Sequence, residues 1–459
     1  MEKHIAKTWK LILFIFPCLF VLSACSSDDY LNVIPQNSIA LVSVDGNDLY
    51  SNSATNEQKS YIKDLLKVND LTDCGIDLSC KVYLFETEDG NIGCVFKVKD
   101  EDDLNEWFND LSKVGYCKNI TSRRGFRFTS IKDTWIAGFS SNALLIMGPV
   151  LPVQQVDVQR QMVKYLEQDE EQGIKVTPIF EKLDSLSSPI SIVAQAAALP
   201  EKLVGPLTIG APKGADASQI MIAAEISKGG NGYLSIKGQT FSFNKTIDSS
   251  LQANKKIFRK IKGTYTESMS QNYAVGMFIN VNGKEFIDVL HSNNSFQTLL
   301  AGMNSAIDMD NIIRSIDGDM SIVIPSLSGV NYLPQMSAEL ANKDFFKDVD
   351  YWKKSCPSGC KIIDWKKNSY YFTDGKLYFY FGVSNDMQFY SGSTPENAYE
   401  SILRSRTALS DNIQKDIIGK HMCFILNLNA VFGNNENQNA AFNLLKPLFG
   451  NIKTILYSM

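Results

Sequence analysis

Histidine is scarce in this chain, and several common catalytic motifs are missing. Only three histidines occur in 459 residues, and only His291 and His421 lie beyond the N-terminal segment. Zinc sites and catalytic triads usually depend on histidine, and neither residue has a second ligand at helical spacing. The G-x-S-x-G and G-x-x-x-x-G-K-[ST] motifs are absent as well. The sequence therefore predicts no catalytic residues, no metal site and no cofactor.

An excess of basic residues is also lacking. The chain holds 45 Lys and Arg against 50 Asp and Glu, a formal net charge of −5. Removing residues 1–24 would make this charge more negative, because they carry three lysines and one glutamate. A negative surface repels phosphate backbones, so we expect no nucleic-acid partner.

The apolar run "LILFIFPCLFVL" (11–22) is too short for a membrane-spanning helix, which needs about 20 residues. Basic residues precede it and small residues follow, as in a secretory signal peptide. Its end, Leu22-Ser23-Ala24-Cys25, resembles the lipobox of bacterial lipoproteins, in which the cysteine is acylated and the signal is cut before it. The alternative is an ordinary signal peptide with a cysteine near its end.

The lipobox resemblance implies that residues 1–24 are removed and that acylated Cys25 holds the chain to a lipid bilayer. Ser26-Ser27-Asp28-Asp29 then resembles the acidic tetrad of Bacteroidetes lipoproteins exported to the outer face of the outer membrane. A plain charged tether is the other interpretation. We expect a cell-envelope, outer-membrane lipoprotein with an acidic tether over 25–35, and surface exposure stays open.

Seven cysteines follow Cys25, so at least one thiol stays unpaired. Cys356 and Cys360 flank the tight turn Pro-Ser-Gly and could form a local disulfide. Plain thiols are nearly as well supported, and half of a zinc site is a weaker alternative because no second pair has matching spacing.

Two segments of the chain resemble each other. Residues 126–148 align without a gap on 370–392 with six identities, placing Phe128 on Phe372 and Gly138 on Gly382. Upstream, "QNSIALVSVDGNDLY" (36–50) resembles "QNYAVGMFINVNGKEFI" (271–287). The pattern predicts an α+β fold: a duplicated module of mainly antiparallel sheet with helices packed on one face.

The domain boundaries follow from this duplication. We expect the following parts: a signal peptide 1–24, a tether 25–35, a first module 36–150, a linking α+β segment 151–270, a second module 271–393 and a C-terminal partial module 394–459.

Acidic residues gather at the start of a predicted helix in the first module. Asp100 precedes Glu101, Asp102 and Asp103, and apolar residues follow at helical spacing. Such a group could be a metal or acid/base site, but helix capping is the better interpretation, because a helix N-terminus favours anions.

The hairpin "SYYFTDGKLYFYFG" (369–382) is the one feature that indicates binding. Asp374-Gly375 marks its turn, and Leu377, Phe379 and Phe381 alternate with Tyr378 and Tyr380. If the Leu/Phe face is buried, the two tyrosines face outward and could stack on sugar rings. Cross-strand packing that only stabilises the hairpin is the simpler alternative. The predicted stacking residues are Trp365, Tyr371, Tyr378 and Tyr380.

Together with the lipobox and the duplication, stretches such as "SIDGDMSIVIP" resemble an uncharacterised family of Bacteroidetes envelope lipoproteins, a domain of unknown function. The resemblance supplies no catalytic residues. We expect a non-enzymatic surface or periplasmic lipoprotein with a binding or structural role, whose ligand the sequence does not identify; a glycan and an envelope protein are the candidate partners. The alternative is a glycan-processing hydrolase, whose two carboxylates come together only in the fold.

Overall fold

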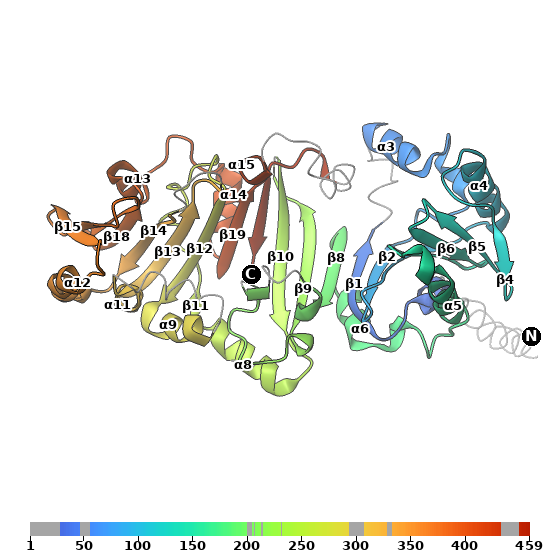
Figure 1. The fold of residues 1–459 in the computed structure, drawn as a ribbon, viewed down its shortest axis with the longest axis horizontal. Helices are drawn as coiled ribbons and strands as arrows, with labels where there is room; N and C mark the ends of the chain where they lie inside the picture. The colour runs from blue at the N-terminus through green and yellow to red at the C-terminus, as the bar shows by residue number, and fades with distance from the viewer. Residues whose placement is uncertain are drawn as a thin grey trace, which may run out of the picture. The chain divides into compact units, whose positions relative to one another are not determined.

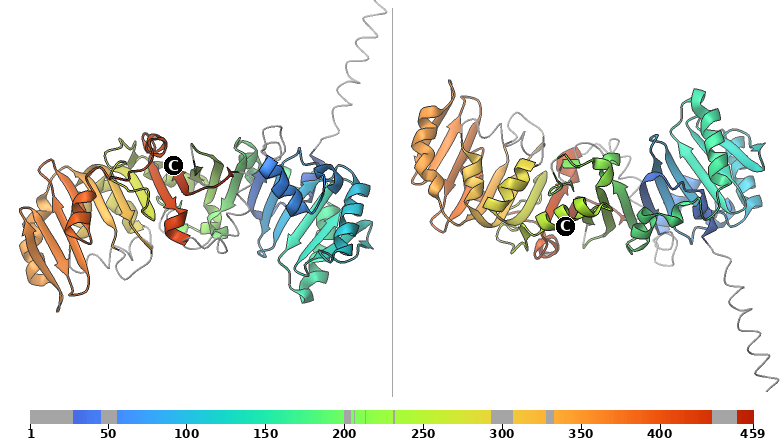
Figure 2. Two further views of the ribbon diagram at one scale, coloured as in Figure 1. Left: turned by 90° about the horizontal axis from the view of Figure 1, so that it is seen from above. Right: turned by 90° about the horizontal axis from the view of Figure 1, so that it is seen from below.

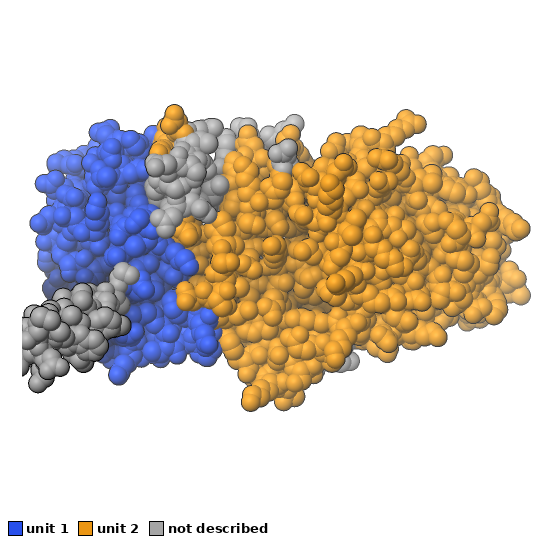
Figure 3. All heavy atoms as spheres, turned by 180° about the vertical axis from the view of Figure 1, so that it is seen from behind, with its two compact units in different colours: residues 1–38, 62–181 blue, residues 39–61, 182–459 orange. Residues whose placement is uncertain are grey.

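The computed structural model describes residues 28–45, 56–199, 204–205, 207–212, 214–230, 232–292, 307–327, 333–432 and 449–459. The chain divides into two compact units, coloured separately in Figure 3: unit 1 (residues 1–38 and 62–181) and unit 2 (residues 39–61 and 182–459). Helices α3 (Asn56–Leu66) and α6 (Pro178–Asp184) contain two of the sequence boundaries between the units. No helix in the described ranges is long and apolar enough to cross a membrane.

Unit 1 contains an antiparallel sheet in the order β2-β3-β7-β6-β5-β4 (Figure 1). Alternating apolar residues form these strands, and Gly90, with a φ of +75°, lies in the turn between β2 and β3. The strands are β2 (Val82–Thr87), β3 (Ile92–Lys97), β4 (Thr121–Arg123), β5 (Phe126–Ile131), β6 (Trp135–Phe139) and β7 (Ala143–Gly148). Short 3-10 helices are η1 (Asp29–Val33), η2 (Leu71–Cys74), η3 (Pro152–Gln154) and η4 (Ile174–Val176).

Helices pack on both faces of the unit 1 sheet, so the prediction of helices on one face is wrong here. Helix α4 (Glu101–Lys113) covers one face, where Phe108 stacks on Phe139 of β6 at 5.5 Å between ring centroids. Helix α5 (Gln155–Leu166) covers the other face, since Met162 lies 3.2 Å from where a Cβ would stand on Gly138. Neighbouring residues of a strand point to opposite faces, so the two helices lie on opposite sides.

Unit 2 contains a long sheet in the order β1-β8-β9-β10-β20-β19-β12-β13-β14-β18-β17-β16-β15. Every pair is antiparallel except β10 with β20. The strands are β1 (Ser38–Val44), β8 (Ile190–Gln195), β9 (Met221–Lys228), β10 (Tyr233–Phe241), β12 (Val275–Asn282), β13 (Ile316–Ile324), β14 (Gln335–Leu340), β15 (Lys361–Lys366), β16 (Ser369–Thr373), β17 (Tyr378–Val383), β18 (Gln388–Gly392), β19 (Met422–Asn427) and β20 (Thr454–Ser458), with β11 (Phe258–Arg259) beside β12.

Two hydrophobic cores lie on opposite faces of this sheet, as β12 illustrates. The helices that lie beside the sheet are drawn in Figures 1 and 2. Ile279 belongs to the core under α9 (Gly283–Ser292), α11 (Met309–Arg314) and α12 (Val349–Ser355). Its neighbour Phe278 belongs to the core under α14 (Asp411–Ile417). The remaining helices are α8 (Lys245–Lys255), α13 (Pro395–Glu400), α15 (Leu428–Phe432), η5 (Ala196–Ala198), η6 (Ala217–Gln219) and η7 (Asp344–Asp348).

The predicted domain boundaries differ from these units. Residues Tyr30, Leu31, Val33 and Ile34 are at most 4% exposed, so most of the predicted tether is part of unit 1 because its apolar side chains are buried there. Strand β8 of the predicted linking segment pairs with β1, and β19 of the predicted C-terminal segment pairs with β12. Both segments therefore contribute to the sheet of unit 2. Residues 1–24, with the predicted signal peptide, and Cys25 lie outside the described residues.

Candidate functional site

The hairpin β16–β17 forms as the sequence predicts, around the turn at Asp374-Gly375. Gly375 has a φ of +90°, a conformation that L side chains rarely adopt. The Asp374 carboxylate accepts hydrogen bonds from the backbone N–H groups of Lys376 (2.9 Å) and Leu377 (2.7 Å). These bonds stabilise the charged form and lower the pKa of Asp374. The turn therefore sets the register in which Thr373 lies opposite Tyr378.

One face of the hairpin is core. Phe379 is 6% exposed and Phe381 is fully buried, and both belong to the cluster that contains Trp352 of α12. Because side chains alternate along a strand, Tyr378 and Tyr380 point to the other face. Tyr378 is 42% exposed and Tyr380 is half-buried. The expected division of the hairpin into an apolar and a tyrosine face is present.

The outer face brings together the four aromatic residues predicted to stack on a ligand. We call Trp365, Tyr371, Tyr378 and Tyr380 the aromatic platform. Tyr371 stacks on Tyr380 at 5.0 Å between ring centroids, and Trp365 meets Tyr380 edge to face at 5.3 Å. The ring centroid of Tyr378 lies 6.2 Å from that of Tyr371 and 6.5 Å from that of Tyr380. Such contacts also stabilise the hairpin itself.

Helix α13 borders the aromatic platform. A Cβ on Gly392 would lie 2.5 Å from the backbone nitrogen of Ala398, so only glycine lets the helix approach β18 this closely. The ring of Tyr399 then meets that of Trp365 edge to face, at 5.7 Å between centroids, and stacks on the ring of Tyr390 at 5.0 Å between centroids. Helix α13 ends at Glu400, and the four platform rings are all partly or largely exposed.

Sequence reasoning missed Tyr399 and Lys366. The ammonium of Lys366 lies 4.9 Å from the ring centre of Trp365 and 4.8 Å from that of Tyr399. Thr394-Pro395 is a recognisable helix start, but nothing in the sequence places this helix over the sheet. Burial, followed by the neighbouring Tyr371 and Tyr378, raises the pKa of Tyr380, so its hydroxyl stays protonated at neutral pH.

Cys356 and Cys360 are both free thiols in the structure, at the two ends of the turn before β15. Burial, followed by the nearby charge of Cys360, raises the pKa of the Cys356 thiol. The structure forms no disulfide between these two thiols, and the local disulfide stays a prediction. In the described ranges, no group of His, Cys, Asp and Glu could hold a metal ion.

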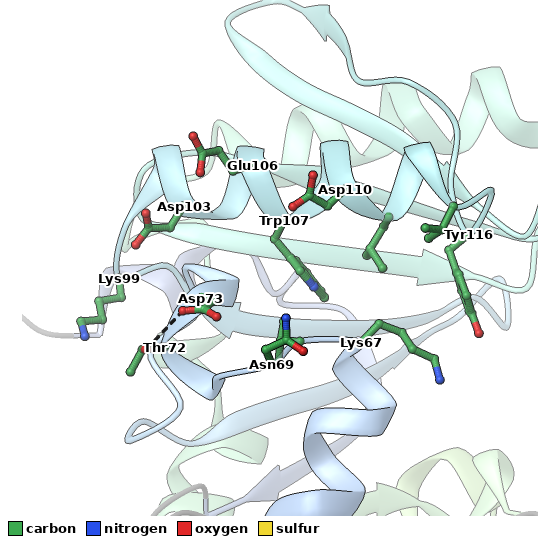
Figure 4. A pocket seen from close by; sticks show the side chains of 13 residues that line it. Lys67, Asn69, Thr72, Asp73, Lys99, Asp103, Glu106, Trp107, Asp110 and Tyr116 are labelled. Atoms are coloured by element: carbon green, nitrogen blue, oxygen red, sulfur yellow. Dashed lines mark hydrogen bonds between the residues drawn. The ribbon is translucent and has the colours of Figure 1, made fainter.

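Unit 1 has a separate pocket of about 900 Å³ between α4, η2 and the segment after α3 (Figure 4). The Trp107 ring points from α4 toward this segment, and its indole N–H donates to the carbonyl of Leu66 at 2.9 Å. Carboxylates outnumber cations in the wall: Asp73, Asp103, Glu106 and Asp110 against Lys67 and Lys99. The pocket can accept a cationic or hydroxyl-rich ligand.

A known protein family covers most of the chain. Residues 30–405 match the family model "Domain of unknown function (DUF4836)". The chain belongs to the DUF4836 family. The predicted membership of an uncharacterised family is thereby confirmed, and the DUF4836 match contains the aromatic platform, Tyr399 and the pocket of unit 1.

No curated protein matches this DUF4836 chain. Two crystal forms of TP0453 are similar to it at 10% sequence identity. Form IV covers 43% of this chain and 76% of TP0453, with a TM-score of 0.27. Form III covers 81% of this chain and 96% of TP0453, with a TM-score of 0.22. At such TM-scores the likeness carries no argument about fold or function.

Proposed function

We propose that this protein is a lipid-anchored protein of the cell envelope that binds a glycan on the aromatic platform and is not an enzyme. The observation that carries the proposal is the set of four touching rings on the outer face of β15, β16 and β17. Sugar rings present C–H groups that pack on aromatic faces, while their hydroxyl groups need polar neighbours. Tyrosine and tryptophan supply both a flat ring and a polar group.

A comparison between the two units supports the proposal. Six strands of each unit are paired in the same spatial order: β2-β3-β7-β6-β5-β4 in unit 1 and β13-β14-β18-β17-β16-β15 in unit 2. In each unit one helix, α4 or α12, follows the second strand of the set along the chain. We infer that the two sets are copies of one module.

The ungapped alignment, however, does not give the strand register. Gly138 lies opposite Phe128, whereas Gly382 lies opposite Ser369 and not opposite Phe372. The reason is the turn, because residues 132–134 connect the first hairpin and the longer segment 374–377 connects the second. Hairpin register follows from turn length.

The two copies differ in the helix that covers the face in question. In unit 1 the 12-residue α5 packs over β6, and Ile136 and Phe128 are at most 1% exposed. In unit 2 the helix at this place in the chain is α13, which has only 6 residues. The equivalent face of unit 2 is therefore left partly open, and it carries Tyr378 and Tyr380, whereas the covered face of unit 1 carries Ile136. A ligand contact there belongs to the second copy alone.

The test uses the fragment that begins at Ser26, titrated with oligosaccharides found by a glycan array. Stacking on an aromatic contributes about 1–3 kcal/mol per ring, by analogy with nucleobases. Replacing both Tyr378 and Tyr380 by alanine should weaken binding tenfold or more while the circular dichroism spectrum stays unchanged. Tyr351→Ala is the matched control, because Tyr351 is 70% exposed on α12, outside the platform. Unchanged affinity in the double variant, or no glycan bound by the parent protein, contradicts the proposal.

The pocket of unit 1 favours a second candidate, a glycan hydrolase. Its carboxylates surround an aromatic ring, and hydrolases use two carboxyl groups about 5–10 Å apart. A hydrolase would release reducing ends from a bound polysaccharide, and Asp103→Asn or Glu106→Gln would abolish the release. Binding without turnover, sensitive to Tyr378 and Tyr380, favours the first proposal.

A further inference from the structure

Lysines surround the aromatic platform on its outer face. Lys361 lies opposite Thr373, which in turn lies opposite Tyr378, and Lys366 lies opposite Ser369 at the other end of β15. Directly opposed residues share a face, so both lysines belong to the side of the sheet that carries the tyrosines. Both side chains are exposed.

These two lysines are not neutralised by carboxylates in the part of the chain that the structure describes. Neither Lys361 nor Lys366 forms an ion pair with a described residue. The opposite face of β15 behaves differently, because Lys353 contacts both carboxylate oxygens of Asp364 at 2.8 Å. Lys353 on that face therefore has a carboxylate partner, whereas Lys361 and Lys366 on the platform face have none among the described ion pairs.

Lys366 has the better position of the two for a ligand. Its ammonium lies beside both Trp365 and Tyr399, at 4.9 Å and 4.8 Å from their ring centres. Cation–π contacts of this kind hold a side chain in place but leave its positive charge available. A sugar stacked on Trp365 would have this charge within reach of its substituents.

Two carboxylates near the platform oppose this charge. Glu396 of α13 lies near Tyr380, where its charge contributes to raising the pKa of that hydroxyl. Asp374 already binds two backbone N–H groups in the turn. The charge of exposed Lys376 helps to lower the pKa of Asp374, so these two turn residues offset each other and Lys361 and Lys366 remain against Glu396.

We propose that the glycan bound by the platform is acidic, with its rings on the tyrosines and an anionic substituent at Lys366. This inference rests on the proposed function. A carboxylate, a sulfate or a phosphate group on the sugar would supply the same chemistry, so the experiment separates the three.

The experiment measures the affinity of the fragment from Ser26 for oligosaccharides in matched pairs, with and without a carboxylate, a sulfate or a phosphate. Lys366→Gln should weaken binding of the acidic members about fivefold, as expected for one exposed ion pair, and leave the neutral members unchanged. Salt should weaken acidic binding in the parent and less so in the variant. Lys354→Gln, at an exposed lysine of α12, should change nothing.

The outcomes separate this inference from the proposed function. Equal binding of acidic and neutral members, or no effect of Lys366→Gln, overturns the acidic glycan but leaves glycan binding intact. If the parent protein binds no member of any pair, both proposals are wrong. A preference for one anion over the other two identifies the substituent.

Discussion

At the scale of single residues, Asp319 shows what the "SIDGDMSIVIP" stretch does. This aspartate is 2% exposed, and its carboxylate accepts hydrogen bonds from the backbone N–H groups of Lys262 (3.0 Å), Gly263 (2.7 Å) and Thr264 (2.9 Å). The side-chain amide of Asn280 donates a fourth bond at 2.7 Å. Four donors around one buried carboxylate fasten the loop before β12 to β13.

Asp319→Asn should lower the free energy of unfolding of unit 2 by about 3 kcal/mol, because an amide group then faces N–H donors and the charged hydrogen bonds are lost. Asp317→Asn, two residues away, is the control. Asp317 pairs with Arg259 at 2.8 Å, but both side chains are more than 40% exposed, so its loss should cost under about 1 kcal/mol. Urea unfolding of the fragment from Ser26 measures both, and equal losses would contradict this account.

At the scale of elements, the acidic residues before α4 behave as a helix cap. The Asp100 carboxylate accepts hydrogen bonds from the backbone N–H groups of Asp102 (2.9 Å) and Asp103 (3.1 Å). Two otherwise unpaired donors of the first turn are satisfied in this way. The capping interpretation of this acidic group agrees with the structure.

Asp100→Ala should destabilise unit 1 by about 1 kcal/mol, the usual cost of losing an N-cap. Asp100→Ser should restore most of this loss, since a serine hydroxyl caps equally well without a charge. Thermal unfolding followed by circular dichroism at 222 nm compares the three proteins. A serine variant as unstable as the alanine variant would mean that the charge matters and not the cap.

At the scale of the whole molecule, few residues of the sequence separate the predicted lipid anchor from the folded chain. Only Ser26, Ser27 and Asp28 separate Cys25 from η1, and Tyr30 and Leu31 are already 3% exposed. Each extended residue spans at most about 3.5 Å. An acylated Cys25 would therefore hold unit 1 near the bilayer surface, with little of the separation that a long tether allows.

Cys25→Ala should abolish incorporation of radiolabelled palmitate and leave the protein uncleaved or released from the membrane fraction. The physical reason is that acyl chains supply about 0.8 kcal/mol per buried methylene, and a chain without the Cys25 thiol cannot be acylated there. Cys80→Ala is a suitable control, because Cys80 is a free thiol within unit 1. A parent protein that takes up no palmitate would refute lipidation.

Local chemistry in the sequence was enough to predict several parts of this structure. The Asp374-Gly375 turn, the alternation of Phe379 and Phe381 with the two tyrosines, and the Asp100 cap all depend on neighbours within a few residues. The same alternation predicted that Tyr378 and Tyr380 share one face, and their role in binding a ligand stays a prediction. Uncharacterised family membership also followed from short stretches of sequence.

Contacts between distant parts of the chain decided the rest. The division into two units depends on β1 pairing with β8, about 150 residues later, and the length of the sheet depends on β10 pairing with β20. Tyr399 became part of the site because Gly392 lets α13 approach β18, a contact between backbones that side-chain patterns do not encode. Lys366 of β15 then lies against the ring of Tyr399. Residue patterns determine which face of an element is apolar, whereas hydrogen bonding and packing between elements determine what covers that face, and so which tyrosines stay open to a ligand.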